Sequence, residues 1–125
     1  MYIVGKIDRN IYKNIIQDIV TDEVIITEER IAHIIQRRGQ EFYDKYGTYF
    51  GEIIENPDYI FADKEHTLLV CKKFMKDKKY VNLALRVVVS TDSAEYKNSI
   101  ITAVGENEKR FKQRLRNNVP LYKNE

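Results

Sequence analysis

Residues 80–90, YVNLALRVVVS, decide the fold because apolar residues recur at every second position. One set of alternate positions is entirely apolar, namely Val81, Leu83, Leu85, Val87 and Val89. The other set is mixed and comprises Asn82, Ala84, Arg86, Val88 and Ser90. This alternation predicts a β-strand whose apolar face lies beneath helices. Arg86 then projects from the sheet face that the helices leave uncovered, where it either serves a site or pairs with a neighbouring carboxylate.

The runs on either side of this stretch also predict strands. They are DYIFADK at 58–64, HTLLVCKKFM at 66–75 and NSIITAVG at 98–105, and short polar segments separate them. Such β-rich runs between turn-forming residues are typical of consecutive strands. Together with residues 80–90 they predict a meander of about four strands.

Helices are expected before and after this meander. After a short strand at 2–7, residues 8–19 predict a helix, and residues 22–27 predict a brief strand or an extended entry to the helix over 28–38. That second helix has Thr27 as its predicted N-cap, two glutamates in its first turn, two arginines in its last turn and Gly39 after it. Residues 42–54 and 106–118 predict further helices. The predicted fold class is α+β, with N-terminal helices packed on a roughly four-stranded antiparallel sheet and a basic C-terminal helix.

Length and composition indicate one ordered domain over residues 1–125. The chain is 43% hydrophobic and 32% charged, which is typical of a globular protein. No apolar run approaches the ~20 residues of a membrane helix, and the first residues lack a secretory leader. We therefore expect no membrane association and a cytoplasmic location. The single cysteine, Cys71, lies in an apolar run and is expected to be a buried small hydrophobe.

The charges are unevenly distributed along the chain. Residues 1–71 contain 8 basic and 13 acidic residues, whereas residues 72–125 contain 13 basic and 6 acidic ones. The last helix carries five of these cations around Phe111 and Leu115, namely Lys109, Arg110, Lys112, Arg114 and Arg116. A basic half of this kind favours binding of a polyanion such as a nucleic acid, although a solvated cationic surface is the alternative.

His33 is the histidine most suited to chemistry. In a helix over 28–38, the isoleucines 31, 34 and 35 form one stripe and His33 lies near the opposite side. Arg30 and Arg37 flank it at i−3 and i+4, where they favour the uncharged imidazole that a general base needs and could hold a phosphate. The alternative is an ordinary exposed histidine. His66 lies in a segment that predicts a hairpin turn and needs no special role.

Several other chemistries lack their motifs. The glycine-containing segment YGTYFG (46–51) has neither the spacing nor the preceding strand of a nucleotide-binding loop, and no histidine or cysteine cluster has zinc spacing. The carboxylates show no calcium or magnesium pattern, and the segment VSTDS (89–93) is not a nucleophile elbow. A metal-independent reaction without a cofactor is the simplest expectation.

Four segments, taken in order, resemble a known family. They are TDEVIITEERIAHIIQRRG (21–39), YFGEIIENPDYIFADK (49–64), LRVVVSTDSAEYKNSIITA (85–103) and RLRNNVPLYKNE (114–125). They resemble the phage-associated branch of the barnase, EndoU, colicin and RelE nuclease fold, over about residues 5–125. The blocks EIIENPDYI and EYKNSIIT are the most specific parts. The resemblance implies helices followed by a four-stranded antiparallel sheet, and endoribonuclease activity.

The resemblance also implies site residues. The implied catalytic set is His33, Arg86, Lys97, Ser99, Thr102 and Tyr122. Substrate-binding residues are expected among Arg30, Arg37, Arg38, Asn98, Arg114 and Arg116. RNA is then the substrate, and an immunity protein or antitoxin is a conditional partner, because such a toxin must be silenced in its own cell. The oligomeric state stays open.

This sequence departs from the family pattern at four positions. Arg38 stands where a helix motif resembling HIxxRH has its second histidine, and Val88 replaces a basic residue. Ala103 and Val104 replace aromatic residues. Two hypotheses therefore remain open. The chain is either a metal-independent endoribonuclease that leaves a 2′,3′-cyclic phosphate, or a degenerate module that binds RNA or a phage protein without cleaving it.

Overall fold

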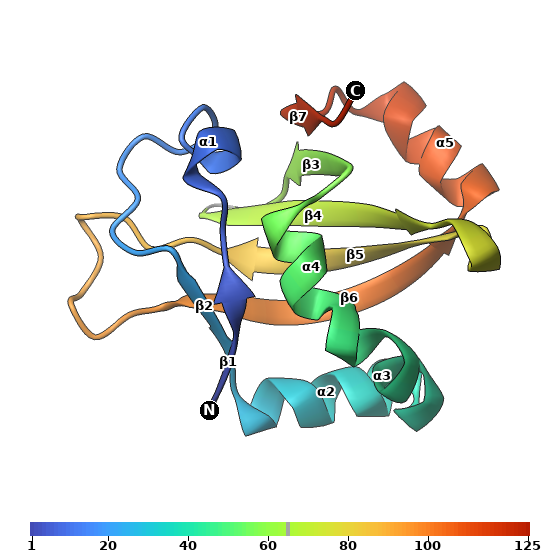
Figure 1. Ribbon diagram of the computed structural model, residues 1–125, viewed down its shortest axis with the longest axis horizontal. Coiled ribbons are helices and arrows are strands. Elements are labelled where there is room, and N and C mark those ends of the chain that lie inside the picture. The colour runs from blue at the N-terminus through green and yellow to red at the C-terminus, as the bar shows by residue number, and fades with distance from the viewer. Residues whose placement is uncertain (65) are drawn as a thin grey trace.

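The computed structural model describes residues 1–64 and 66–125, and a mixed β-sheet forms its centre (Figure 1). Within the described residues the sheet has seven strands in the order β1-β2-β6-β5-β4-β3-β7. The strands are β1 (Tyr2–Lys6), β2 (Glu23–Ile26), β3 (Tyr59–Ala62), β4 (Thr67–Phe74), β5 (Lys79–Arg86), β6 (Asn98–Asn107) and β7 (Tyr122–Lys123). The antiparallel meander β3-β4-β5-β6 is confirmed. The predicted α+β class is confirmed, but the prediction of a roughly four-stranded antiparallel sheet was wrong, because β1, β2 and β7 extend the sheet and β2 runs parallel to β6.

The helices agree with the sequence patterns only in part. They are α1 (Arg9–Tyr12), α2 (Glu28–Arg38), α3 (Gln40–Tyr46), η1 (Gly47–Tyr49), α4 (Phe50–Glu55), η2 (Met75–Asp77) and α5 (Glu108–Asn117). The helix α2 has the predicted bounds, and the Thr27 hydroxyl caps it by accepting a hydrogen bond from the Arg30 N–H at 3.2 Å. No helix of the described residues is long and apolar enough to span a membrane.

The helix predicted over residues 8–19 was wrong beyond its first turn. Only α1 forms, and Ile19 instead makes an isolated antiparallel bridge with Val89. Two physical reasons account for the early end. The segment is rich in β-branched isoleucine, which disfavours helix, and Asn14 donates from its side chain to the Asn10 carbonyl at 3.2 Å.

The predicted apolar face of β5 lies in the main core. Val81, Leu83, Leu85 and Val87 are at most 1% exposed and pack with residues of α2, α3 and α4. The ladder ends at Arg86, four residues earlier than the sequence pattern indicates. Beyond it, the Val88 N–H donates to the Asn98 side chain at 2.7 Å instead of to a neighbouring strand.

The opposite face of the sheet is partly covered by α5, which corrects the expectation that no helix lies on the Arg86 face. Phe111 of α5 stacks on Tyr80 with the ring centroids 3.6 Å apart, and both pack with Phe61 and Cys71. Cys71 is fully buried as predicted, and this burial raises the pKa of its thiol. The helix covers the end of the face that lies near residues 80 and 106, so the end near Arg86 remains open.

The helix α2 lies along the edge of β6 that β2 leaves largely unpaired. The strand β2 pairs with β6 only at Asn98 and Ser99, so α2 lies along the remainder of the β6 edge (Figure 1). The Arg38 Nε donates to the Ala103 carbonyl there at 2.9 Å. The α2 helix therefore lies at the sheet edge, directly beside the strand that carries Ser99 and Thr102.

Candidate functional site

A pocket of about 430 Å³ opens on the uncovered end of the α5 face. It lies where the end of β5, the start of β6 and the first turn of α2 meet. Side chains from four segments line it, among them Thr27, Arg30, Arg86, Tyr96, Lys97 and Ser99. Three of these side chains are cations, and the carboxylate of Glu95 also lines the pocket. We call this hollow the cationic pocket.

Arg86 is held in the cationic pocket by two contacts. Its Nη2 donates to Asp92 Oδ1 at 3.2 Å, and its guanidinium lies 5.2 Å from the centre of the Tyr96 ring. The second oxygen of Asp92 accepts a hydrogen bond from the Val89 N–H at 2.9 Å, which anchors the carboxylate in its own loop. Arg86 thus pairs with a neighbouring carboxylate and also faces a pocket. A guanidinium has five N–H donors, so a single bond to Asp92 leaves others for a ligand.

The pairing of β5 with β6 places two hydroxyls on the face of Arg86. Ser99 is the direct partner of Arg86, and Thr102 is the partner of Ala84 two residues along β5. Paired residues and residues two apart in a strand share one face, so Ser99 and Thr102 both lie on the face of Arg86. Ser99 lines the pocket, whereas Thr102 does not. A bulge in β6 lies between the two residues.

The helix α2 brings Arg30 to the pocket and His33 to its vicinity. Arg30 lines the pocket, and His33 follows three residues later on the same side of the helix. His33 is half-buried, does not line the pocket, and has no hydrogen bond or ion pair among the described residues. Arg37 lies one turn after His33 on that side and is exposed.

Two predicted site residues have positions elsewhere. Tyr122 is on β7. Three strands, β5, β4 and β3, lie between β7 and β6, so β7 is about 19 Å from β6 at the usual strand spacing. Its side chain packs against the main core on the other face of the sheet. Asn98 is fully buried, accepts from the Val88 N–H, and donates to the carbonyls of Thr21 and Glu23 at 2.6 and 3.0 Å. Asn98 therefore joins three backbone segments and does not reach the pocket.

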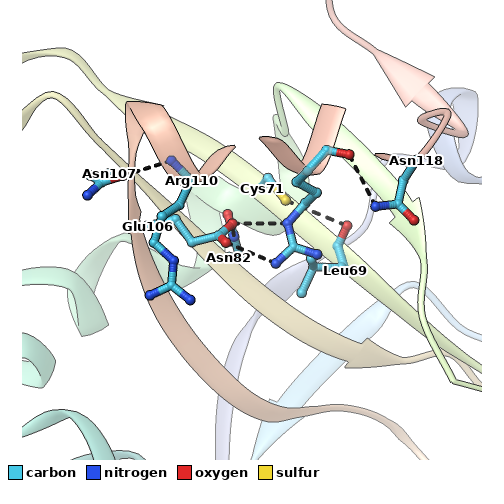
Figure 2. A network of polar contacts seen from close by, with 8 residues as sticks. Leu69, Cys71, Asn82, Glu106, Asn107, Arg110 and Asn118 are labelled. Carbon is cyan, nitrogen blue, oxygen red and sulfur yellow. Dashed lines mark hydrogen bonds and ion pairs between the residues drawn. The ribbon is translucent and has the colours of Figure 1, made fainter. Parts of the chain in front are cut away.

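The arginines of α5 also lie away from the pocket. Arg114 forms two hydrogen bonds of 3.0 Å with the carboxylate of Glu106, whose side chain is 8% exposed. Glu106 also accepts from the buried Asn82 amide (Figure 2). Arg114 thus anchors α5 on the sheet, a structural role that the charge pattern of the helix did not indicate. Arg116 is exposed on the same helix, and Arg38 is committed to the Ala103 carbonyl.

Sequence reasoning missed Tyr96 and Asp92. Both belong to the loop between β5 and β6, which contains TDSAEYK (91–97), and of this segment only Lys97 was among the predicted site residues. An aromatic residue directly before Lys97 could have drawn attention, since aromatic residues interleaved with cations are typical of sites for unpaired nucleotides. Its contact with Arg86 depends on loop conformation, which no periodicity reveals.

The arrangement is suited to an anionic group with hydrogen-bond acceptors. Guanidinium, ammonium and hydroxyl donors converge from α2, β5 and β6, as is common where a phosphate is bound. Among residues 1–64 and 66–125, no group of three or more histidine, cysteine, aspartate or glutamate side chains is gathered so that it could hold a metal ion.

The chain matches a known family. Residues 3–123 match the family described as phage-Barnase-EndoU-ColicinE5/D-RelE like nuclease2. No curated protein and no solved structure matches the chain. The match covers nearly the whole sequence, including every strand that contributes to the cationic pocket. The chain therefore belongs to this family of phage-associated nucleases.

Proposed function

We propose that the protein is a metal-independent endoribonuclease that cleaves RNA by attack of a ribose 2′-hydroxyl on the adjacent phosphate. The observation that carries this proposal is the convergence of Arg30, Arg86 and Lys97 with the Ser99 hydroxyl in one open pocket. A phosphodiester in this pocket would meet three cations and a hydroxyl donor. Membership of a nuclease family supports a phosphodiester as the bound group.

In the proposed reaction, the 2′-oxygen forms a bond to phosphorus and the bond from phosphorus to the 5′-oxygen breaks. The products are a 2′,3′-cyclic phosphate and a free 5′-hydroxyl. The 2′-hydroxyl must lose a proton and the departing 5′-oxygen must gain one. Arg86 and Lys97 stabilise the charge that develops on the phosphate oxygens, and Arg30 holds the same group from the helix side.

His33 is the proposed proton-transfer group. It lies one helical turn from Arg30, on a helix that runs along the edge of the strand bearing Ser99. Its imidazole has no hydrogen bond or ion pair among the described residues, so no protein contact has to be broken before it binds substrate. Proton transfer requires that the bound RNA extend from the pocket along α2 toward His33.

The test is incubation of the purified protein with total tRNA and ribosomal RNA in EDTA, followed by analysis of the new ends. We expect cut RNA with 2′,3′-cyclic phosphate ends. Arg86→Ala should lower kcat by about 100- to 1000-fold, as loss of one transition-state donor commonly does. Arg9→Ala is a matched control, since Arg9 is ion-paired with Asp22 outside the pocket. RNA that stays intact, or ends without a cyclic phosphate, would refute the mechanism.

A second candidate function is RNA binding without cleavage. The observation that favours it is the commitment of Arg38, at the position of the second histidine in the similar motif, to the Ala103 carbonyl. This leaves His33 as the only histidine of α2 for proton transfer. RNA affinity that falls steeply with salt, with no product formed, would support this alternative.

A further inference from the structure

A second hollow adjoins the cationic pocket. Its volume is about 300 Å³, and it lies between the β5–β6 loop and the segment before β2. Its walls are mainly apolar, from Val20, Val88, Val89 and Ala94, with Asp92 and Ser93 among its polar groups. We call it the loop hollow. Ligand sites are commonly apolar hollows of this size with a few placed polar groups.

Tyr96 is the residue that the two hollows share. It lines both of them, whereas Arg86 lines only the cationic pocket. The Arg86 guanidinium lies 5.2 Å from the centre of the ring, so one face of the ring is occupied on the cationic side. The Tyr96 side chain is nevertheless exposed, with 54% of the residue accessible. The ring is thus available for stacking on the side of the loop hollow.

The loop hollow is held in shape by the surrounding backbone. Val20 donates to the Val88 carbonyl at 3.3 Å, and the Asp92 N–H donates to the Val89 carbonyl at 2.9 Å. The Tyr96 N–H donates to the Ser93 carbonyl at 3.0 Å, and Val88 is bonded to the buried Asn98. These bonds preorganise the loop, which lowers the cost of binding a ligand there.

We propose that the loop hollow binds the unpaired base of a nucleotide whose phosphate occupies the cationic pocket. The inference rests on the proposed function, because it takes the ligand of the cationic pocket to be an RNA phosphodiester. Bases of single-stranded RNA stack on aromatic side chains that lie beside phosphate-binding cations. Ser93 and Asp92 also line the hollow and supply a hydroxyl and a carboxylate for contact with the edge of such a base. The hollow therefore gives the protein a preference among bases at the bound phosphate.

The test compares two probes that cannot be cleaved. One is a fluorescent 2′-O-methyl RNA hexanucleotide, and the other is the same backbone without any base. Both carry the same phosphates, so a difference in Kd measures only the bases. We compare the wild-type chain with Tyr96→Ala and Tyr96→Phe. Tyr49→Ala is a matched control, because Tyr49 is similarly exposed and lines neither hollow.

The wild type should bind the complete probe more tightly than the abasic one. Tyr96→Ala should weaken binding of the complete probe by about 5- to 150-fold, which is the range for loss of one stacked base. The abasic probe should lose much less, at most the roughly fivefold that removal of the exposed Arg86–Tyr96 contact costs. Tyr96→Phe and Tyr49→Ala should bind both probes as the wild type does. Thermal unfolding of each variant confirms that it is folded.

Three results would overturn the inference: equal loss for both probes in Tyr96→Ala, no loss for either, or no binding of either probe by the wild type. Cleavage of unmodified RNA is scored separately. If RNA is cut but Tyr96→Ala still prefers the complete probe as strongly as the wild type does, the base site is refuted and the proposed nuclease function is not. Base-dependent binding without any cut RNA supports the base site and refutes the cleavage mechanism.

Discussion

Arg86 makes structural contacts within the protein and still has N–H donors available in the cationic pocket. It pairs with Asp92, lies against Tyr96 and still faces the cationic pocket. Because the Asp92 carboxylate is itself bonded to the Val89 backbone, it fixes the direction in which the guanidinium points. A lysine at this position would keep the charge but lose this planar, multiply bonded geometry. At the residue scale, position and orientation therefore matter as much as charge.

His33 provides the sharpest prediction at this scale. His33→Ala should lower kcat for RNA cleavage by about 100- to 10,000-fold, because a positioned general acid or base contributes that much. Added imidazole should restore part of the activity, since the deleted ring leaves space beside the substrate. Initial rates with and without imidazole measure both effects.

The stability of the same variant separates catalysis from folding. His33 has no hydrogen bond or ion pair among the described residues, so the unfolding free energy should change by less than about 0.5 kcal/mol. A variant that keeps full activity would show that another group transfers the protons.

At the scale of elements, α2 and α5 use their arginines differently. Arg30 of α2 faces the cationic pocket, whereas Arg114 of α5 is bound to Glu106 beneath the helix. The difference arises from what lies under each helix. The first turn of α2 adjoins an open hollow, whereas α5 covers a strand that carries a buried carboxylate.

Arg114→Ala should therefore act on stability. It leaves the Glu106 carboxylate buried without its cation, and we expect a loss of about 3 kcal/mol, at the low end for buried pairs because Arg114 is partly exposed. Urea unfolding followed by circular dichroism measures it. Adding Glu106→Gln should recover part of the loss, and Arg116→Ala on the same helix should be nearly neutral. An Arg114→Ala variant as stable as the wild type would contradict this structural role.

The contact between α4 and β1 depends on a glycine. A Cβ on Gly51 would lie 2.6 Å from the Val4 carbonyl oxygen, which is a backbone atom that cannot rotate away. Gly51→Ala should therefore destabilise the protein by about 1–3 kcal/mol, the usual cost of overpacking. Gly105→Ala is the control, because its nearest neighbour is the flexible Lys79 side chain at 3.2 Å. Denaturant midpoints of the two variants should differ clearly, and equal midpoints would refute the argument.

At the scale of the whole molecule, the basic half of the chain does not form one continuous site. The cationic pocket includes Arg30 from the acidic half, and it lies on the same sheet face as α5 but at the end that α5 leaves uncovered. Charge counted along the sequence therefore describes the surface poorly, because folding brings together residues from both halves.

The salt dependence of RNA binding tests this view. One phosphodiester held by the pocket cations predicts a slope of log K against log salt of about −0.7 for a single strand. Lys97→Ala should weaken binding and flatten this slope, whereas Lys45→Ala, whose lysine is ion-paired with Asp77 elsewhere, should change neither. A salt dependence steeper than this, which becomes weaker in Arg116→Ala, would instead show that the bound RNA also contacts α5.

The sequence predicted the parts of the molecule that depend on neighbours within a few residues. Thr27 as the cap of α2 and the buried face of β5 follow from local spacing, and both are confirmed. The two-residue strand β7 was missed because so short a segment carries no periodicity. The helix predicted over residues 8–19 ends after its first turn, because a local side-chain hydrogen bond and a bridge to Val89 stabilise another conformation of the segment.

By itself, the sequence determined the α+β class, the meander and the face of the sheet to which Arg86 belongs, because a period of two assigns each strand residue to a face. Only the tertiary structure decided which cations share a pocket. The pairing of β5 with β6 brings Ser99 beside Arg86, and the short reach of β2 leaves the β6 edge to α2 and Arg30. The same folding buries Asn98 and places Tyr122 at the far edge of the sheet. Strand order and loop conformation depend on contacts between distant residues, and these contacts leave no spacing in the chain from which they can be inferred.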